Sequence, residues 1–335
     1  MTTLNDIAKA AGVDVSTASR ALNGTGKVHY ETRERIVEAA KNLEYYSSRL
    51  DIKYSKKMAK TIAIIIADVR CLVNSEIIQV MEERLRTAGY FALLGNASYQ
   101  SENLLKYIDI FAETGVEGIV LMATSQKGLK RNLEKLKKKS DIPLIQVVPM
   151  YESPIYDYVK VDDVQAAEMA MGHLIGFGHK RIAFIGDEST DVRQDCYYQM
   201  MKKHNLSQRE DYIMVSNMRY EKAGYFACTK LLDREERPTA IFAAYDDIAI
   251  GAMRAIYESK LSIPEDISII AIDNIVNSTY LYRALTTVST PSYDVGVIAS
   301  KIILSKLHDR TLKTVQYVSV KPELLVRETV AKPKY

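Results

Sequence analysis

The first 45 residues contain three short segments in which apolar side chains recur every three or four positions. In the first segment, Leu4, Ile7, Ala8 and Ala11 follow the spacing that places side chains on one face of a helix. Gly12 interrupts this pattern where a tight turn needs a residue that tolerates positive φ. The pattern therefore predicts a short helix that ends in a turn.

Two further helices are predicted in the same region. Asp14 is a favourable N-cap for a helix over residues 15–22, in which Ala18, Ala21 and Leu22 face inward. Residues 23–26 form a loop by composition. The third helix has its buried face at Ile36, Ala39, Ala40 and Leu43. A helix, a glycine-containing turn and a second helix together make a helix-turn-helix unit.

From residue 61 the pattern changes to short, continuous apolar strands that alternate with amphipathic helical segments. The strands are predicted at 61–67, 90–95, 118–122, 143–148, 181–186, 212–216, 239–244 and 267–272. The helices are predicted near 75–88, 101–114, 127–138, 195–204, 221–232 and 246–258. Strands that are apolar on both faces indicate parallel sheets, and two successive runs indicate two α/β lobes. Ligands bind such sheets beyond the carboxyl ends of the strands, so a cleft between the lobes is expected.

Length and composition are those of a folded protein with two to three domains. The chain has 335 residues, of which 47% are hydrophobic and 26% charged. No segment approaches the roughly 18 apolar residues of a membrane helix, and the first residues do not resemble a secretory signal. Three scattered cysteines argue against a disulfide framework and against a metal cluster. We therefore expect a cytoplasmic protein without membrane association or cofactors.

Positive charge is concentrated on the helix-turn-helix segment and the residues that follow it. Residues 1–60 contain 11 Lys or Arg and 7 Asp or Glu, whereas the rest of the chain has one more acidic than basic residue. The outward side of the second helix carries Arg20, which suits guanine, and Val15, which suits a thymine methyl group. The placement of charge favours DNA binding. The helical spacing alone is weak evidence, and a three-helix bundle with an ordinary polar surface is the alternative.

Two strings, DIAKAAGVDVSTASRALNG and KVHYETRERIVEAAKNLEYY, carry a more specific signal. They resemble, without gaps, the N-terminal domain of the lactose/galactose-repressor (LacI/GalR) family. The resemblance implies binding to double-stranded DNA at an inverted-repeat operator. The residues expected to contact DNA are Thr3, Val15, Ser16, Thr17, Ser19, Arg20, Asn23, His29, Thr32, Arg33 and Tyr54.

Residues 47–60 correspond to the hinge that joins the DNA-binding domain, 1–46, to the body. In the resembled family this stretch forms a helix on DNA and inserts a Leu into the minor groove, which kinks the site. Here Tyr54 stands where that Leu is expected, and Asp51 would repel phosphates. Two readings of these residues therefore remain: a hinge that bends DNA, and a flexible tether between head and body.

The body resembles the same family over most of its length. The segments HLIGFGHKRIAFIGD, RPTAIFAAYDDIAIGAMRAI, SIPEDISIIAIDN and LTTVSTP follow its motifs, and the likeness covers about residues 3–329. It implies a periplasmic-binding-protein-like body over 61–335 in which the chain crosses between the lobes three times. The first lobe is expected at about 61–160 and 291–320, and the second at about 161–290 and 321–330.

The family resemblance also nominates residues that would bind a small-molecule effector. Arg193 matches the family's R-x-x-G-[FYW] arginine, with Cys196 in place of the glycine, and a guanidinium can bind two adjacent hydroxyls. A surface ion pair with Asp191 or Asp195 is the alternative for this arginine. The other expected effector residues are Asp246, Asp273, Asn96, Asp162 and Tyr245.

Three of these effector assignments have a structural alternative. Asp246 and Asp273 follow predicted strands and would accept hydrogen bonds from sugar hydroxyls, but either carboxylate also suits a helix N-cap. Tyr245 would stack on a sugar face or pack between lobes. The family's D-x-x-N-P-F-F motif, whose aromatics line the cleft, is replaced by a stretch with Asp68 and Asn74 and no aromatic residue. We expect a sugar, and the segments following the third helix and around 249–274 suggest the galactoside-responsive branch.

The sequence disfavours two other classes of protein, an enzyme and a secreted sugar receptor. An enzyme is disfavoured because the adjacent pairs Asp162-Asp163 and Asp246-Asp247 do not face one substrate, and no nucleotide-binding motif is present. A secreted sugar receptor is disfavoured by the DNA-binding segment. We therefore expect a transcriptional repressor that works as a homodimer, since the tail after Arg327 is too short for a tetramerising heptad bundle. The effector would shift the relative angle of the lobes.

Overall fold

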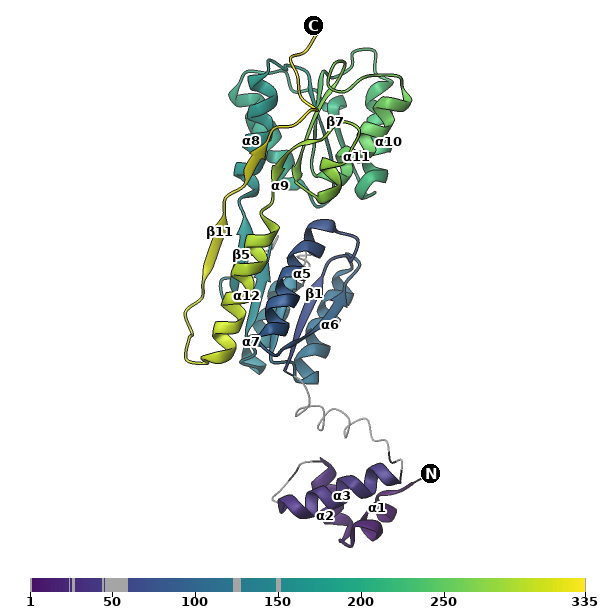
Figure 1. Cartoon of the computed structure of the whole chain (residues 1–335), viewed down its shortest axis with the longest axis vertical. Coiled ribbons are helices and arrows are strands. Elements are labelled where there is room, and N and C mark those ends of the chain that lie inside the picture. Colours follow the sequence, from purple (N-terminus) through teal and green to yellow (C-terminus); the bar gives the residue numbers. More distant parts are fainter. Residues whose placement is uncertain are drawn as a thin grey trace.

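The computed structural model describes residues 2–23, 25, 28–43, 45, 60–122, 128–148 and 152–334. The head has three helices, α1 (Leu4–Ala11), α2 (Val15–Asn23) and α3 (Tyr30–Asn42), which pack around a small apolar core of their own. Gly12 ends α1 at φ 64°, so the predicted turn has the backbone that favours glycine. Figure 1 shows this head as a body separate from the two larger lobes.

The first lobe is built on a six-stranded parallel sheet in the order β11-β5-β4-β3-β1-β2. Its first part comprises β1 (Thr61–Ile66), α5 (Leu72–Thr87), β2 (Phe91–Asn96), α6 (Ser101–Thr114), β3 (Gly118–Met122), α7 (Leu129–Lys139), β4 (Leu144–Val147) and β5 (Asp157–Val161). Two apolar clusters cover the two faces of this sheet. Burial on both faces explains why β1 and β3 are apolar throughout.

The second lobe is built on another six-stranded sheet, in the order β12-β10-β9-β8-β6-β7. It comprises α8 (Asp163–Gly176), β6 (Ile182–Asp187), α9 (Asp191–Lys203), β7 (Ile213–Ser216), α10 (Tyr220–Leu232), β8 (Ala240–Ala243), α11 (Asp246–Glu258), β9 (Ser268–Asp273) and β10 (Thr286–Ser289). Short 3-10 turns lie at Glu210–Tyr212 and Val276–Thr279. Its strands pair in parallel except β10 with β12 (Glu323–Leu325), which pair antiparallel.

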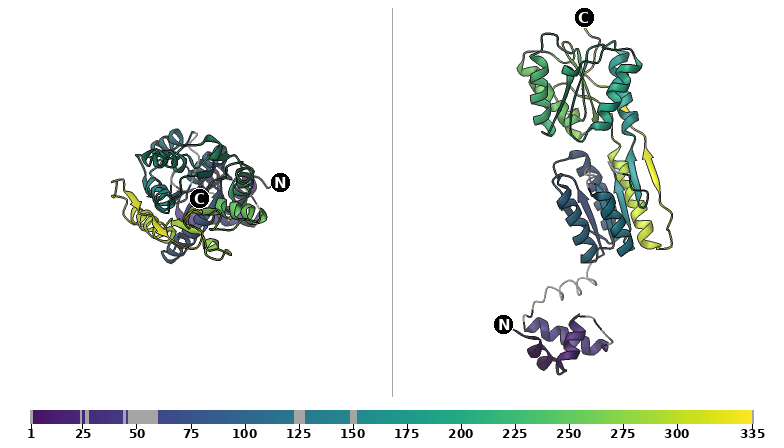
Figure 2. Two further views of the ribbon diagram at one scale, coloured as in Figure 1. Left: turned by 90° about the horizontal axis from the view of Figure 1, so that it is seen from above. Right: turned by 180° about the vertical axis from the view of Figure 1, so that it is seen from behind.

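The chain passes between the lobes three times, after β5, after β10 and after β11. The second passage leads into α12 (Ser292–His308), which packs against α5 of the first lobe, and the third leads from β11 (Tyr317–Val320) to β12. Figures 1 and 2 show α12 and β11, in yellow, alongside the first lobe, while the C-terminus lies at the far end of the second. The expected architecture, a helical head with two parallel α/β lobes, is confirmed.

Two helices of the second lobe approach each other closely and fix one side of the cleft. A side chain on Gly224 of α10 would collide with the Ile248 carbonyl, and one on Gly251 of α11 would collide with the Glu221 carbonyl. These glycines allow α10 and α11 to pack backbone against backbone. The first residues of both helices, Tyr220 and Asp246, are therefore held at fixed positions near the ends of the strands.

Candidate functional site

The exposed side of α2 carries the side chains expected to read DNA. Asp14 caps this helix as predicted, because its carboxylate accepts the Thr17 N–H at 2.8 Å and the Ser16 and Thr17 hydroxyls at 2.6 and 2.7 Å. These hydrogen bonds lower the pKa of Asp14. Arg20 lies back along the helix, with Nε 3.2 Å from the Ser16 carbonyl and Nη2 3.2 Å from the Thr17 hydroxyl. The side chain of Val15 beside them is 42% exposed.

The other expected DNA contacts are spread over the head. Ser19 accepts a hydrogen bond from Asn23 at 3.1 Å within α2. Thr3 forms a capping box with Asp6 at the start of α1. His29 is exposed just before α3, and Thr32 and Arg33 are half-buried on that helix. Tyr54 and nearly all of the expected hinge lie outside the described residues.

A cavity of about 430 Å³ lies between the lobes. It is lined from the first lobe by residues that follow β1 to β5 and from the second by residues that follow β6 to β9. This is the edge at which ligands bind open α/β sheets. The polar and aromatic residues that line it include Asn74, Tyr99, Asp162, Asp163, Arg193, Arg219, Tyr220, Tyr245, Asp247 and Asp273.

Arg193 is at the centre of a half-buried polar cluster in this cavity. Its Nε and Nη2 donate to one oxygen of Asp163 at 3.0 and 2.8 Å, and its Nη1 donates to the Ala244 carbonyl at 2.6 Å. An Asp273 oxygen lies 3.5 Å from Nη2. Burial raises the pKa of Asp273 to about 6, although the Arg193 charge opposes this rise. The expected alternative, a surface ion pair with Asp191 or Asp195, is wrong because the partners are Asp163 and Asp273.

Two of the expected effector residues do not line the cavity. Asp246 is fully buried and accepts the Ile275 N–H at 2.9 Å and the Thr287 hydroxyl at 2.6 Å. It therefore ties α11 to the loop after β9, and it does not cap its own helix, where Tyr245 is the N-cap. Asn96, at the end of β2, accepts the Ser98 N–H at 3.3 Å and is likewise absent from the cavity lining.

Asp162 and Tyr245 line the cavity and also have structural partners. Asp162 caps α8 by accepting the Gln165 N–H at 3.0 Å. The Tyr245 hydroxyl donates to Asp187 at 2.6 Å and accepts the Tyr220 N–H at 3.1 Å. Its ring therefore meets the cavity while its hydroxyl holds the second lobe together.

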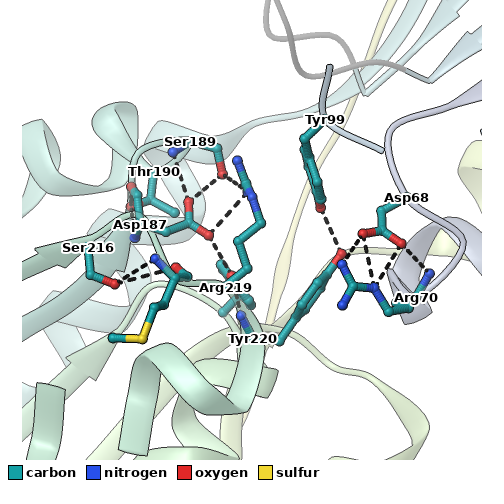
Figure 3. A network of polar contacts seen from close by, with 11 residues as sticks. Asp68, Arg70, Tyr99, Asp187, Ser189, Thr190, Ser216, Arg219 and Tyr220 are labelled. Carbon is teal, nitrogen blue, oxygen red and sulfur yellow. Dashed lines mark hydrogen bonds and ion pairs between the residues drawn. The ribbon is translucent and has the colours of Figure 1, made fainter. Parts of the chain in front are cut away.

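A network that sequence reasoning missed joins the two lobes across the cavity (Figure 3). The hydroxyls of Tyr99, from the first lobe, and Tyr220, from the second, lie 2.8 Å apart. The Arg219 guanidinium lies 3.6 Å from the centre of the Tyr99 ring and donates to Asp187 and Ser189 at 3.3 and 3.2 Å. Tyr99 and Tyr220 have positive φ, 58° and 60°, so the backbone holds both in an unusual conformation.

The same network explains how the cleft obtains aromatic walls without aromatics after β1. Arg70, held by two hydrogen bonds of 3.1 Å and one of 2.6 Å to Asp68, lies 5.2 Å from the centre of the Tyr220 ring. Tyr99 and Tyr220 therefore supply aromatic side chains to the cleft from other positions in the chain. The only sequence signal for them was their place shortly after β2 and β7.

Fold and site together define a ligand-binding, two-lobed protein joined to a DNA-reading head. Residues 3–48 match the family model "Bacterial regulatory proteins, lacI family", and residues 171–330 match "Periplasmic binding protein-like domain". The HTH-type transcriptional repressor PurR of Vibrio campbellii is 31% identical, covering 99% of each chain. This chain belongs to the LacI family. It is a DNA-binding transcriptional repressor with an effector-binding domain, and not an enzyme.

Solved structures agree with this fold. A LacI-family regulator from Enterococcus faecium with bound ribose is 26% identical and superposes with a TM-score of 0.70, covering 82% of this chain and all of that one. The lac repressor dimer bound to operator and the anti-inducer ONPF is 21% identical, with a TM-score of 0.71, 98% of this chain and 99% of that one covered. The PurR relatives do not support the expected galactoside-responsive branch. Within the described residues, no helix is long and apolar enough to cross a membrane.

Proposed function

We propose that this repressor binds an inverted-repeat operator as a homodimer and that a sugar in the inter-lobe cavity controls its affinity for DNA. The observation that carries the effector assignment is the Arg193–Asp163–Asp273 cluster on the cavity wall. A planar guanidinium and fixed carboxylates offer donors and acceptors to adjacent hydroxyls. The volume of about 430 Å³ is in the range of small-molecule sites.

The charge of the cavity favours an uncharged ligand over an anion. Among the described lining residues, six carboxylates face three cationic side chains, Lys160, Arg193 and Arg219. Each of these cations already has a carboxylate partner within 3.3 Å, which leaves little positive potential for a phosphate group. The ribose bound to the Enterococcus faecium regulator is consistent with a neutral sugar in this position.

An exposed apolar strand edge supports the homodimer. β2 lies at the edge of the first sheet, and its side chains Phe91, Leu93 and Leu94 are 64%, 42% and 49% exposed. Apolar side chains exposed along an edge strand mark a surface where another chain associates. A second copy covering this edge would bring two heads together to read half-sites in successive major grooves. The protein would then act in the cytoplasm, with the DNA.

On DNA, α2 would lie in the major groove with Arg20 on a guanine and Val15 beside a thymine methyl group. The exposed cluster of Ser16, Thr17 and Arg20 supports this assignment. The remaining side chains would bind phosphates or neighbouring bases: Thr3, Ser19, Asn23, His29, Thr32 and Arg33, with Tyr54 as the candidate minor-groove wedge.

Ligand and DNA would be coupled through the arrangement of the lobes. The cavity takes residues from both lobes, so a ligand that contacts both favours one arrangement, and by reciprocity operator DNA changes the affinity for that ligand. Arg193, Asp163 and Asp273 all belong to the second lobe or its border, whereas Tyr99 and Asn74 belong to the first.

Isothermal titration of the full-length protein with ribose, glucose, galactose, cellobiose and ribose 5-phosphate tests the effector assignment. We expect one neutral sugar to bind to wild type and not to Arg193→Lys, which keeps the charge but loses the planar fork. Asp195→Asn, an exposed carboxylate away from the cavity, serves as control. Binding of the phosphorylated sugar alone would contradict the proposal.

A further inference from the structure

One buried carboxylate in the cavity lacks a side-chain partner among the described residues; the hydrogen bond it accepts comes from its own backbone N–H. Asp247, the second residue of α11, is 7% exposed and lines the cavity. Among the described residues it forms no ion pair and no hydrogen bond with another side chain. Buried charges are paired in most proteins, because an isolated charge is costly to desolvate. A carboxylate that faces a cavity without a charged side-chain partner therefore points to a ligand that supplies one.

The surroundings of Asp247 make this part of the cavity negative. Burial raises the pKa of Asp247 to about 7, and the carboxylates of Glu221 on α10 and Asp273 at the end of β9 add to this rise. From the first lobe the facing group is Cys71, whose thiol is kept neutral because burial raises its pKa to about 12. The N-terminus of α11 supplies only a partial positive charge. In the part of the chain that the structure describes, no full positive charge acts on Asp247.

The cationic side chains that line the cavity form ion pairs with carboxylates other than Asp247. Arg193 pairs with Asp163 at 2.8 Å and with Asp273 at 3.5 Å. Arg219 pairs with Asp187 at 3.3 Å, and Lys160 pairs with Glu152 at 2.6 Å. The remaining lining carboxylates differ from Asp247 because Asp162 caps α8 and Asp191 is exposed.

We propose that Asp247 forms a subsite for a protonated amine, so that the effector of this repressor is an amino sugar or a related amino polyol. This inference rests on the proposed function, because the cavity is the effector site. The ammonium group would pair with Asp247, while the hydroxyls of the same ligand would meet the Arg193 cluster. Binding of the cation would also favour the ionised form of Asp247.

Matched pairs of ligands that differ by one amino group test this subsite in the full-length protein. The pairs are glucosamine with glucose, galactosamine with galactose, and 2-amino-1,3-propanediol with glycerol, each measured by isothermal titration and by thermal shift at equal ionic strength. We expect the amine of at least one pair to bind at least tenfold more tightly than its neutral parent. Asp247→Asn should abolish that preference, whereas Asp195→Asn should preserve it.

The possible results separate this inference from the proposed function. Equal or tighter binding of the neutral compound in every pair would overturn the subsite, as would an amine preference that survives in Asp247→Asn. If no sugar binds but the propanediol amine binds in an Asp247-dependent way, the sugar assignment fails and the subsite stands. If the neutral sugars bind without any amine preference, the proposed function stands and the subsite fails.

Discussion

The hydrogen bond between Tyr99 and Tyr220 should hold the two lobes together. Tyr99→Phe and Tyr220→Phe each remove one hydroxyl of the 2.8 Å contact and keep both rings, so the Arg219 and Arg70 contacts with those rings remain possible. A hydrogen bond between neutral groups contributes about 1 kcal/mol net. Its loss should therefore shift the equilibrium between closed and open lobes about fivefold towards the open arrangement.

Hydrogen exchange measured by mass spectrometry on the full-length protein reports this change at residues 97–100 and 217–220. Exchange in both segments should become about fivefold faster in either variant, and the double variant should match the single ones because all three lose the same bond. Tyr225→Phe is the matched control, since its hydroxyl bonds to Glu258 within the second lobe. Unchanged exchange rates, or effects that add in the double variant, would refute the claim that this hydrogen bond holds the lobes together.

Three further predictions concern DNA reading, the effector site and pH. Arg20→Ala should lose about 1–3 kcal/mol of operator preference while weak non-specific binding remains, and an unchanged ratio between operator and random DNA would contradict the docking of α2. Arg193→Ala should lower the free energy of unfolding in urea by about 1–2 kcal/mol, because Asp273 and the partly exposed Asp163 lose their cation, and a smaller loss than for Asp195→Asn would contradict the cluster. The pKa of Asp247 is about 7 in the folded state and 3.8 in an unperturbed side chain, so between these values the folded protein holds a proton that the unfolded chain has lost. The contribution of Asp247 to the free energy of unfolding should therefore fall by about 1.4 kcal/mol for each unit by which the pH rises from 5 towards 7. In a urea series over that range the difference between wild type and Asp247→Asn should show this slope, and parallel pH profiles would contradict it.

Local sequence patterns predicted the helices and strands of this protein well where the structure depends on residues within a single element. Asp14 and Gly12 were identified as cap and turn because each acts on its own neighbours in the chain. The helix at Asp246–Glu258 was predicted with its observed bounds. The strand β5 was missed because its buried and half-buried residues alternate, unlike the continuous apolar strands of the sheet centre. The helix α12 was not predicted either, whereas the start of α8 at Asp162 was.

The effector cavity was harder to predict because it depends on the direction of single side chains and on the meeting of two lobes. Asp246 and Asp247 are adjacent, yet successive residues of a helix point about 100° apart, so one is buried behind the sheet end and the other faces the cavity. Tyr99 and Tyr220 are 121 positions apart, and no local pattern links them. Arg193, which was expected to bind an effector, lines the cavity, but its partners Asp163 and Asp273 come from separate elements.

The most direct test of the central claim is the binding of full-length protein to an inverted-repeat DNA taken from upstream of its own gene. Fluorescence anisotropy would be measured with and without the neutral and amino sugars, and with random DNA as reference. The account predicts that the protein binds the inverted repeat more tightly than random DNA and that one of these ligands changes this affinity. Binding of the inverted repeat no tighter than that of random DNA, or operator affinity indifferent to every ligand that occupies the cavity, would contradict it.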